Sequence, residues 1–324
     1  MMILASENAL VDYIVRTMPA VDCELVRVGI GDDAAVIRPL GQGYETVVTT
    51  DQLVEDKHFT RGTHPAGSLG GKLIARGVSD VAAMGGQPQW FLLSLCLAEW
   101  CSEEWIKQFI TGLFQTINSL QISGLPLIGG DLASGKIFSA HVTVAGSVLT
   151  ERALLRSGAR DGDSLFVSGK LGGSALGLER LLGGADPDDP AVLRHINPEA
   201  RLALGQFLVD AGASAAIDIS DGLSIDAGRL AKASGLAVEI EAERVPRFAE
   251  TSDEHVWHGG EEYELLFAAP PTAAIPDELD GLEITRIGTF RAGAGVFRNE
   301  RGASSAVPIH GFDHLSSKSH VGES

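Results

Sequence analysis

The sequence predicts an α+β protein with two domains, and three observations lead to this prediction. The chain has 324 residues, enough for two domains of ordinary size. Each half alternates strand-like and helical segments, with neighbouring strands that look antiparallel mixed in. A turn-rich segment at 158–163 separates the halves. We therefore expect a mixed α/β domain over 1–150, an α+β domain over 151–316 and a polar tail over 317–324.

The composition allows a substantial core and argues against polyanionic partners. Hydrophobic residues make up 44% of the chain, and the formal net charge is −18. Nucleic acids and anionic membranes need a basic surface on their partner, so we expect neither of them to bind. An acidic protein can still bind an anionic substrate when metal ions supply the positive charge.

Cysteine usage and hydropathy favour a cytoplasmic protein. The three cysteines, Cys23, Cys96 and Cys101, form no CxxC pair, which is typical of a reduced compartment. The first residues lack a basic flank followed by an apolar core, so we expect no signal peptide. The longest apolar run, at 90–97, is too short to span a membrane.

In the first half, apolar spacing predicts the helices and strands. Helices are expected where apolar residues recur on one face, at 5–18, 68–84 and 102–120. Ser102 is the expected N-cap of the third helix. Strands are expected at 24–28, 34–37, 45–50, 89–97, 125–128 and 138–149. The strand at 89–97 is almost continuously apolar, which is typical of a strand buried on both faces.

The second half begins with a strand at 164–167 and a Gly-rich turn that opens a helix ending at residue 182. An acidic loop is expected at 185–190, and a helix at 198–209 with Pro198 in its first turn. A helix at 223–233 and a Gly-acid turn at 257–264 follow. Strands are expected at 216–217, 237–241, 265–268 and 284–290.

Aspartates at the ends of apolar runs are the main functional signal. Asp218 and Asp221 follow one short apolar strand, and two neighbouring carboxylates are costly unless a cation lies between them. The full set is Asp33, Asp51, Asp80, Asp131, Asp218 and Asp221. Any one of them could simply cap a helix or a turn. Together they predict one divided metal site, with oxygen ligands that favour Mg²⁺ and a phosphorylated nucleotide as substrate. These residues alone leave the acceptor open.

Other nucleotide and metal motifs do not fit the chain. Gly29 and Gly31 begin a dinucleotide-like pattern, but a strand is expected where that motif needs a helix. Asp32 and Asp33 would also repel a pyrophosphate. The Gly-Lys pairs at 71–72 and 169–170 lack the remaining residues of a P-loop, and no metalloprotease histidine pair is present.

Seven segments, taken in order, closely resemble the thiamine-monophosphate kinase family. They are GIGDD at 29–33, TTD at 49–51 with His58 and Phe59, VSDVAAMG at 78–85, LIGGD at 127–131, LRSGA at 155–159, IDISDGL at 217–223 and GGEEYEL at 259–265. The resemblance covers nearly the whole chain. It implies the two-domain ATP-binding α+β fold of a superfamily that includes aminoimidazole ribonucleotide synthetase. It also implies an N-terminal domain that binds ATP and Mg²⁺ and dimerises, and a C-terminal domain that completes the active site.

The resemblance implies ATP-dependent phosphorylation of thiamine monophosphate to thiamine diphosphate, by direct in-line transfer. The implied ligands of several Mg²⁺ ions are Asp33, Thr49, Thr50, Asp51, Asp80, Asp131, Asp218 and Asp221. The implied ATP contacts are Gly130, Asp131, Arg156 and Ser220, and the implied substrate contacts are His58, Glu261 and Phe312. No further catalytic residue is assigned, because the acceptor phosphate is already an anionic nucleophile. A homodimer paired through the N-terminal halves is also implied.

The chain departs from the family pattern at two places. Some relatives carry Tyr where this chain has Phe312, and the segment 132–134 is not Thr-rich. His58 has an alternative role as a satisfied polar residue at a strand end. Arg156 has an alternative role in a surface ion pair.

Two other functions remain as alternatives. One is another ATP-dependent enzyme of the superfamily, such as aminoimidazole ribonucleotide synthetase. The selenophosphate synthetase and hydrogenase-maturation members need a reactive cysteine near one terminus, whereas Cys23 is expected in the core and no cysteine follows Cys101. The other alternative is a non-catalytic ATP-binding protein, although such a protein would be expected to lose carboxylates.

Overall fold

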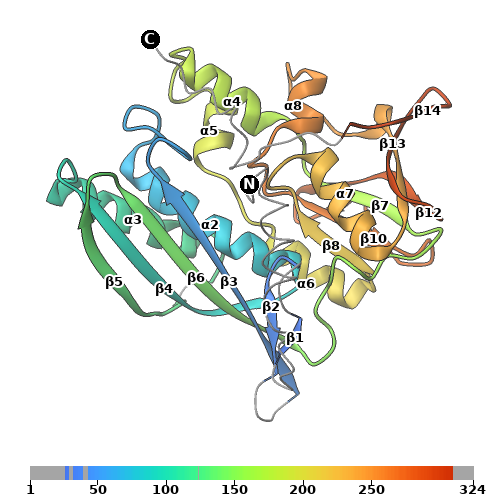
Figure 1. Ribbon diagram of the computed structural model, residues 1–324, viewed down its shortest axis with the longest axis horizontal. Helices are drawn as coiled ribbons and strands as arrows, with labels where there is room; N and C mark the ends of the chain where they lie inside the picture. The colour runs from blue at the N-terminus through green and yellow to red at the C-terminus, as the bar shows by residue number, and fades with distance from the viewer. Residues whose placement is uncertain (1–25, 29–31, 39–42, 123, 309–324) are drawn as a thin grey trace, which may run out of the picture.

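Two β-sheets organise the chain, one in each half (Figure 1). The computed structural model describes residues 26–28, 32–38, 43–122 and 124–308. The helix expected at 5–18, the first three residues of the Gly-Asp motif at 29–33, the residue Phe312 and the polar tail at 317–324 lie outside the described residues.

The first sheet has six strands in the order β1-β2-β3-β6-β4-β5. Their bounds are β1 Val26–Val28, β2 Ala35–Ile37, β3 Tyr44–Val54, β4 Gln87–Ala98, β5 Leu127–Gly135 and β6 Ser139–Leu149. Only the β4–β5 pair is parallel, and the other neighbours are antiparallel. The sheet therefore needs few long crossovers.

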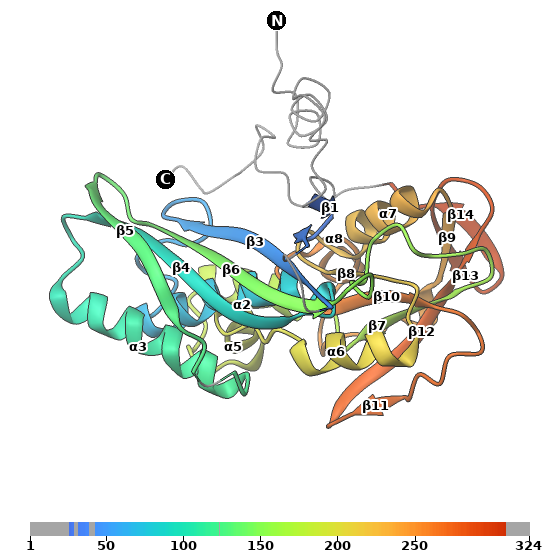
Figure 2. The ribbon, with the colours of Figure 1, turned by 90° about the horizontal axis from the view of Figure 1, so that it is seen from below.

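Helices α2 (Ala66–Ala83) and α3 (Glu103–Ser119) lie along one face of this sheet (Figures 1 and 2). Because successive strand residues point to opposite faces, Val47, Leu53 and Val142 all point toward these helices, and all three are fully buried. Ser102 accepts a hydrogen bond from Trp105 N, so the expected N-cap of α3 is confirmed. No helix of the described residues covers the other face (Figure 1).

The second sheet follows the order β14-β13-β9-β12-β7-β10-β8, and β11 pairs with β12 at its side. Its strands are β7 Ser164–Ser168, β8 Ala215–Asp218, β9 Ala237–Glu241, β10 Leu265–Ala269, β11 Glu278–Leu279, β12 Leu282–Arg291, β13 Gly295–Glu300 and β14 Ala303–Ala306. The helices of this half are α4 Gly173–Leu182, α5 Pro190–Ile196, α6 Leu202–Ala211, α7 Leu223–Ser234 and α8 Asp253–His258, with a 3-10 turn, η1, at Ala242–Arg244. Most of its strand pairs are antiparallel and the β9–β13 pair is parallel, which confirms the α+β class.

Two strands run further than the sequence indicates. The strand expected at 45–50 continues through Asp51 to Val54, and β5 continues through the expected Gly-Gly-Asp turn to Gly135. Each extension pairs with a neighbour residue by residue. Gly130 allows the close backbone approach that this pairing requires, since a Cβ atom there would lie 1.8 Å from Leu93 O. Asp51 and Asp131 are therefore inside strands rather than at strand ends.

The helices of the second half differ from expectation at three places. Helices α5 and α8 were not predicted, and the helix expected from Pro198 begins only at Leu202. Helix α5 begins at Pro190, where the Asp189 side chain caps the N–H groups of the first turn. Arg201 stays outside α6, and its guanidinium donates hydrogen bonds to the buried Glu264 carboxylate. Tertiary contacts thus decide where these helices begin.

Helix α2 lies at the centre of the molecule and contacts both halves. It packs against β3, β4 and β6 of the first sheet and against α6 and β8 of the second half. The contact with α6 is very close, since a Cβ atom on Gly205 would lie 2.0 Å from Ala82 O. Within the residues that the structure describes, every helix is too short or too polar to cross a membrane.

The contact between α2 and α3 gives a testable prediction. A Cβ atom on Gly70 would lie 1.9 Å from Phe109 O, whereas one on Gly67 would meet its nearest neighbour, Gln108 O, at an ordinary 3.6 Å. We expect Gly70→Ala to destabilise the protein by about 1–3 kcal/mol or more, because the backbones must separate. Gly67→Ala should be neutral or stabilising by up to about 1 kcal/mol, since alanine favours helix. Urea unfolding of both variants checks this, and equal effects would contradict it.

Candidate active site

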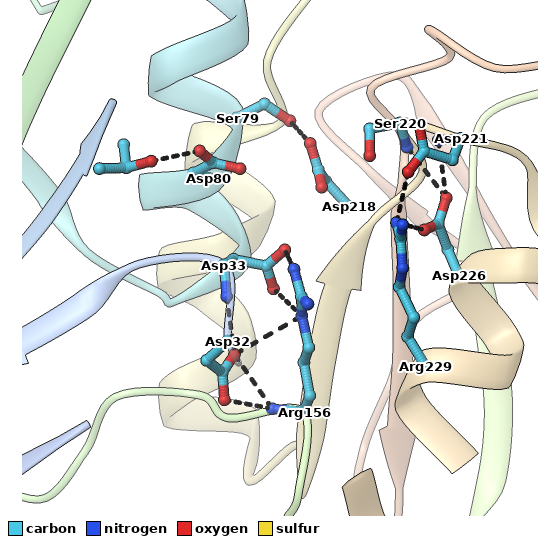
Figure 3. Close-up of polar contacts among 11 residues, drawn as sticks. Asp32, Asp33, Ser79, Asp80, Arg156, Asp218, Ser220, Asp221, Asp226 and Arg229 are labelled. Atoms are coloured by element: carbon cyan, nitrogen blue, oxygen red, sulfur yellow. Dashed lines mark hydrogen bonds and ion pairs between the residues drawn. The ribbon is translucent and has the colours of Figure 1, made fainter. Parts of the chain in front are cut away.

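Three carboxylates from distant parts of the chain converge where the two halves meet (Figure 3). Asp33 lies in the turn between β1 and β2, Asp80 in the last turn of α2, and Asp218 is the final residue of β8. One oxygen of each lies within 4.8 Å of the others. Carboxylates this close repel one another, so cationic side chains or hydrogen-bond donors must lie beside them.

Each carboxylate of the cluster has its own hydrogen-bond donor. Thr49 Oγ1 donates to Asp80 Oδ2 at 2.5 Å, and Ser79 Oγ donates to Asp218 Oδ2 at 2.7 Å. The Arg156 guanidinium binds Asp33 through both Nε and Nη2. Its backbone N–H also donates to Asp32. Arg156 is therefore a counter-ion of the cluster, not a residue of a surface ion pair.

The cluster strongly favours bound cations or protons. Burial, and next the charge of Asp33, raises the pKa of Asp218 to about 8. Burial, and next the charge of Asp218, raises the pKa of Asp80 well above its usual range. A set of buried carboxylate oxygens without histidine or cysteine fits Mg²⁺ better than Zn²⁺. The residues present thus fit the expected metal.

Asp226 shapes the turn that carries the Asp-Ser-Asp motif, and sequence reasoning missed this residue. Its Oδ2 accepts three backbone hydrogen bonds, from Ser220, Asp221 and Gly222, at 3.0–3.1 Å. Arg229 Nη1 donates to both Asp226 Oδ1 and Asp221 Oδ2. Burial raises the pKa of Asp226 to about 7. The turn is therefore tied to the first turns of α7, as Figure 3 shows.

The Gly-acid segment at 259–264 lies directly against that turn. Glu261 N donates to Ser220 O at 2.7 Å, and Tyr263 N donates to Ile219 O at 2.9 Å. Glu261 and Tyr263 have φ values of 59° and 52°, in the left-handed region that disfavours residues with side chains. Such conformations persist where surrounding contacts hold them, and they cluster at functional sites.

Asp51 and Glu261 are close to each other but outside the cluster. Both accept hydrogen bonds from Arg76, at 2.9 Å to Asp51 Oδ1 and 3.1 Å to Glu261 Oε1. Glu261 Oε2 also accepts from the buried Lys72, at 3.0 Å. The cations Lys72 and Arg76 were not predicted as site residues. Their spacing could have indicated this role, because Lys72, Arg76 and Asp80 follow one another at four-residue intervals and so share one side of α2.

Asp131 points to the opposite face of the first sheet. It belongs to a row of paired residues that crosses four strands, from Gln52 through His141 and Ser94 to Asp131. Paired residues point to the same face. Asp131 therefore points as Gln52 does, and Asp51, the residue before Gln52 in β3, points to the helix-covered face.

Thr50 lies on the same face as Asp131. Its hydroxyl donates to Val142 O at 3.1 Å and accepts from Thr143 Oγ1 at 3.2 Å. A single copy of the chain therefore separates the side chains of Thr50 and Asp131 from the cluster. Gly130 is the residue before Asp131 on the edge strand β5.

His58 follows β3 in a turn, where its Nδ1 accepts a hydrogen bond from Val54 N at 3.1 Å. This contact gives His58 the structural role at a strand end that the sequence also allows.

A second buried group surrounds Lys72. Its Nζ donates to His195 O at 3.1 Å and lies 3.4 Å from His64 Nε2. Burial, together with the charge of Lys72, lowers the pKa of His64 to about 2 and of His195 to about 3. Both imidazoles are therefore uncharged in the folded protein at neutral pH.

Comparison with known proteins identifies the family of this chain. Residues 31–150 match the family model of the AIR synthase related protein N-terminal domain, and residues 160–298 match that of the C-terminal domain. The thiamine-monophosphate kinase of Haemophilus influenzae is 35% identical over 313 residues, which cover 90% of this chain and 92% of that protein. The enzyme of the same name from Escherichia coli is 36% identical over 309 residues, which cover 90% and 92%.

Two solved structures of this family are similar to the chain over more than nine-tenths of its length. AaThiL complexed with AMPPCP and TMP superposes with a TM-score of 0.83 at 33% identity, over 97% of this chain and 98% of that chain. Thiamine monophosphate kinase from Aquifex aeolicus superposes with a TM-score of 0.76 at 32% identity, over 91% and 97%. The hydrogenase maturation protein HypE in complex with ATP, at 17% identity and a TM-score of 0.69, shows likeness in fold alone over 91% and 92%.

The two buried histidines predict how stability depends on pH. An unfolded histidine has a pKa near 6.5, so below that pH each of these two histidines binds a proton in the unfolded chain but not in the folded protein. Asp218 and Asp226, whose pKa values are raised by burial, contribute in the opposite direction. Each histidine should therefore lower the free energy of unfolding by at most roughly 2 kcal/mol between pH 6.5 and 5, in addition to the opposite contribution of these carboxylates. Chemical unfolding at both pH values checks this. Relative to the wild-type protein, His195→Asn should lose up to roughly 2 kcal/mol less, or gain that much more, free energy of unfolding from pH 6.5 to 5. An identical pH dependence of both proteins would contradict the assignment.

Proposed function

The chain belongs to the thiamine-monophosphate kinase family of AIR synthase related proteins, and from this premise we propose that it transfers the terminal phosphoryl group of ATP to thiamine monophosphate. The products are thiamine diphosphate and ADP. Support comes from the 35% identity to a thiamine-monophosphate kinase over 90% of this chain. The likeness to a structure that holds AMPPCP and TMP supports both substrates.

The observation that carries the proposal is the convergence of Asp33, Asp80 and Asp218 between the two halves. We propose that these three hold Mg²⁺, with Thr49, Asp51 and Asp221 as further ligands. When bound, Mg²⁺ reduces the repulsion between two phosphate-bearing substrates and the charge that develops during transfer.

The chain's own residues would bind and orient the nucleotide. Arg156 forms a two-point contact with Asp33 and has a planar guanidinium suited to phosphate. We propose that it binds the ATP phosphates once a metal ion takes over the charge of Asp33. Ser220, the second proposed ATP contact, is held in the Asp-Ser-Asp turn by the hydrogen bond from its backbone N–H to Asp226. An acceptor phosphate oxygen is anionic already, so no general base is needed.

His58, Glu261 and Phe312 are the proposed contacts for thiamine monophosphate. Glu261 lies beside the Asp-Ser-Asp turn, and its carboxylate is already matched by Lys72 and Arg76. It would therefore serve to accept hydrogen bonds and would not add net negative charge near a phosphate.

Thr50, Gly130 and Asp131 would act only after a second copy of the chain pairs with the first sheet along its open edge, next to the helix-free face that carries Thr50 and Asp131. That face ends at β5, an edge strand with unpaired backbone groups. Large apolar side chains are exposed on β5 and beside it, namely Leu127, Ile128, Leu132 and Ile137. Exposed apolar surface along an open edge favours a protein partner. We propose a homodimer, and a cytoplasmic location consistent with the free thiols of Cys96 and Cys101.

The reaction can be followed by phosphorus NMR of the protein with ATP, Mg²⁺ and thiamine monophosphate. We expect ADP and the β-phosphate signal of thiamine diphosphate to appear together and to stop on chelation. Asp218→Asn should reduce turnover by about 100-fold or more, because a ligand of the charge-neutralising metal is lost. Its metal-free melting temperature should not fall, since Asn preserves the acceptor for Ser79 and cannot ionise next to Asp33 and Asp80.

Other outcomes would change the assignment. Consumption of ATP with formylglycinamidine ribonucleotide, but not with thiamine monophosphate, would replace the substrate and keep the fold. Full activity of Asp218→Asn would remove the metal site from the proposal. No turnover with either acceptor would favour a non-catalytic ATP-binding protein.

The proposed dimer has its own test. Leu132→Glu places a charge on a side chain that is 73% exposed at the edge strand. We expect this variant to shift sedimentation from dimer to monomer, because a charge buried at an interface without a partner is costly. Leu182→Glu changes a leucine that is 65% exposed on α4 and should leave the dimer intact. A monomeric wild-type protein would contradict the proposal.

A further inference from the structure

Helix α2 carries a polar stripe that the proposed chemistry does not use in full. Lys72, Arg76 and Asp80 occupy successive turns, so their side chains lie along one side of the helix. Asp80 belongs to the carboxylate cluster. Lys72 and Arg76 extend the stripe from the cluster toward Glu261, the proposed substrate contact.

Arg76 joins a proposed metal ligand to a proposed substrate contact. Its Nη2 donates to Asp51 Oδ1 at 2.9 Å, and its Nη1 donates to Glu261 Oε1 at 3.1 Å. Its guanidinium also lies 5.9 Å from the centre of the Tyr263 ring. One side chain thus contacts β3 of the first half and the strained loop of the second half. A planar group with several fixed donors can make both ion pairs at once, which an ammonium group cannot do as well.

Lys72 holds the other oxygen of Glu261. Its Nζ is fully buried and donates to Glu261 Oε2 at 3.0 Å and to His195 O at 3.1 Å. The Glu261 carboxylate is therefore fixed at both oxygens by two cations of the same helix. Its backbone, with φ at 59°, is fixed through the hydrogen bond to Ser220 O. These contacts leave Glu261 little freedom to rotate.

We propose that Arg76 is a positioning residue for the acceptor, which sets Glu261 at a defined distance from the metal ligand Asp51. This inference rests on the proposed function. Asp51 would help to hold the metal ion, which supplies positive charge to the reacting phosphates, and Glu261 would orient the remainder of the phosphate-bearing acceptor. Arg76 links the two, so that acceptor and metal cluster keep the alignment that in-line transfer requires. Within the described residues, no hydrogen bond or ion pair joins Arg76 to Arg156 or Ser220, the proposed ATP contacts.

The test compares Arg76→Gln and Arg76→Lys with the wild-type protein. We expect Arg76→Gln to raise the KM for thiamine monophosphate by about 10- to 100-fold, the effect of losing two charge-assisted hydrogen bonds. The KM for ATP should change less than about 2-fold, because the nucleotide contacts are untouched. The KM of Arg76→Lys for thiamine monophosphate should lie between those of the wild-type protein and Arg76→Gln. Lysine keeps the buried positive charge but reaches only one carboxylate at a time.

Equilibrium binding gives a readout that does not depend on turnover. Calorimetric titration of thiamine monophosphate, with Mg²⁺ and a non-hydrolysable ATP analogue present, should show the same loss of affinity in Arg76→Gln. The matched control is Arg152→Gln, which removes an exposed ion pair with Asp210 away from the site. It should leave both KM values unchanged.

Two results would overturn the inference. One is an unchanged acceptor KM in Arg76→Gln. The other is an equal loss for both substrates together with a lower melting temperature in both Arg76 variants, which would mark a purely structural ion pair. Failure of the wild-type protein to phosphorylate thiamine monophosphate would instead overturn the proposed function, and so would be distinguished from either result.

Discussion

Mutual repulsion among buried carboxylates is the constraint on which this structure depends. Two unit charges about 4 Å apart repel each other by roughly 4 kcal/mol at the effective dielectric of a protein site. Asp33, Asp80 and Asp218 are nevertheless held within 4.8 Å of one another. Hydrogen bonds from Thr49 and Ser79 and the guanidinium of Arg156 offset part of that repulsion. The repulsion that remains favours binding of a multivalent cation. Phosphoryl transfer between two anionic substrates needs such a cation to reduce their repulsion.

Helix α2 connects this electrostatic constraint to the packing of the fold. Two helices approach α2 very closely, α3 at Gly70 and α6 at Ala82. The contact at Ala82 lies only two residues from Asp80, and so the packing of α6 sets how near α2 comes to Asp218 at the end of β8. The polar stripe of Lys72, Arg76 and Asp80 runs along the same helix toward Glu261. Stability and site geometry are therefore coupled through one element.

The second half supplies loops whose shape is imposed by side chains. Asp226 accepts three backbone N–H groups of the Asp-Ser-Asp turn, and the 259–264 segment adds hydrogen bonds from the other side. Glu261 and Tyr263 keep left-handed backbone conformations within these contacts. A loop that is held in this way presents its functional groups without further ordering when a ligand binds, which reduces the entropy lost on binding.

The sequence by itself determined the alternation of strands and helices, the cap at Ser102 and the oxygen-only set of candidate ligands, because these depend on residue type and local spacing. It placed Asp218 correctly at the end of a strand. It placed Asp51 and Asp131 wrongly at strand ends, because pairing with β6 and β4 extends both strands beyond their apolar cores. Only the tertiary structure decided that Asp51 faces α2 while Asp131 faces away, and that Arg76, Lys72 and Asp226 hold the site together. Strand register, sheet face and partner choice are set by segments far apart in the chain, and no local pattern contains that information.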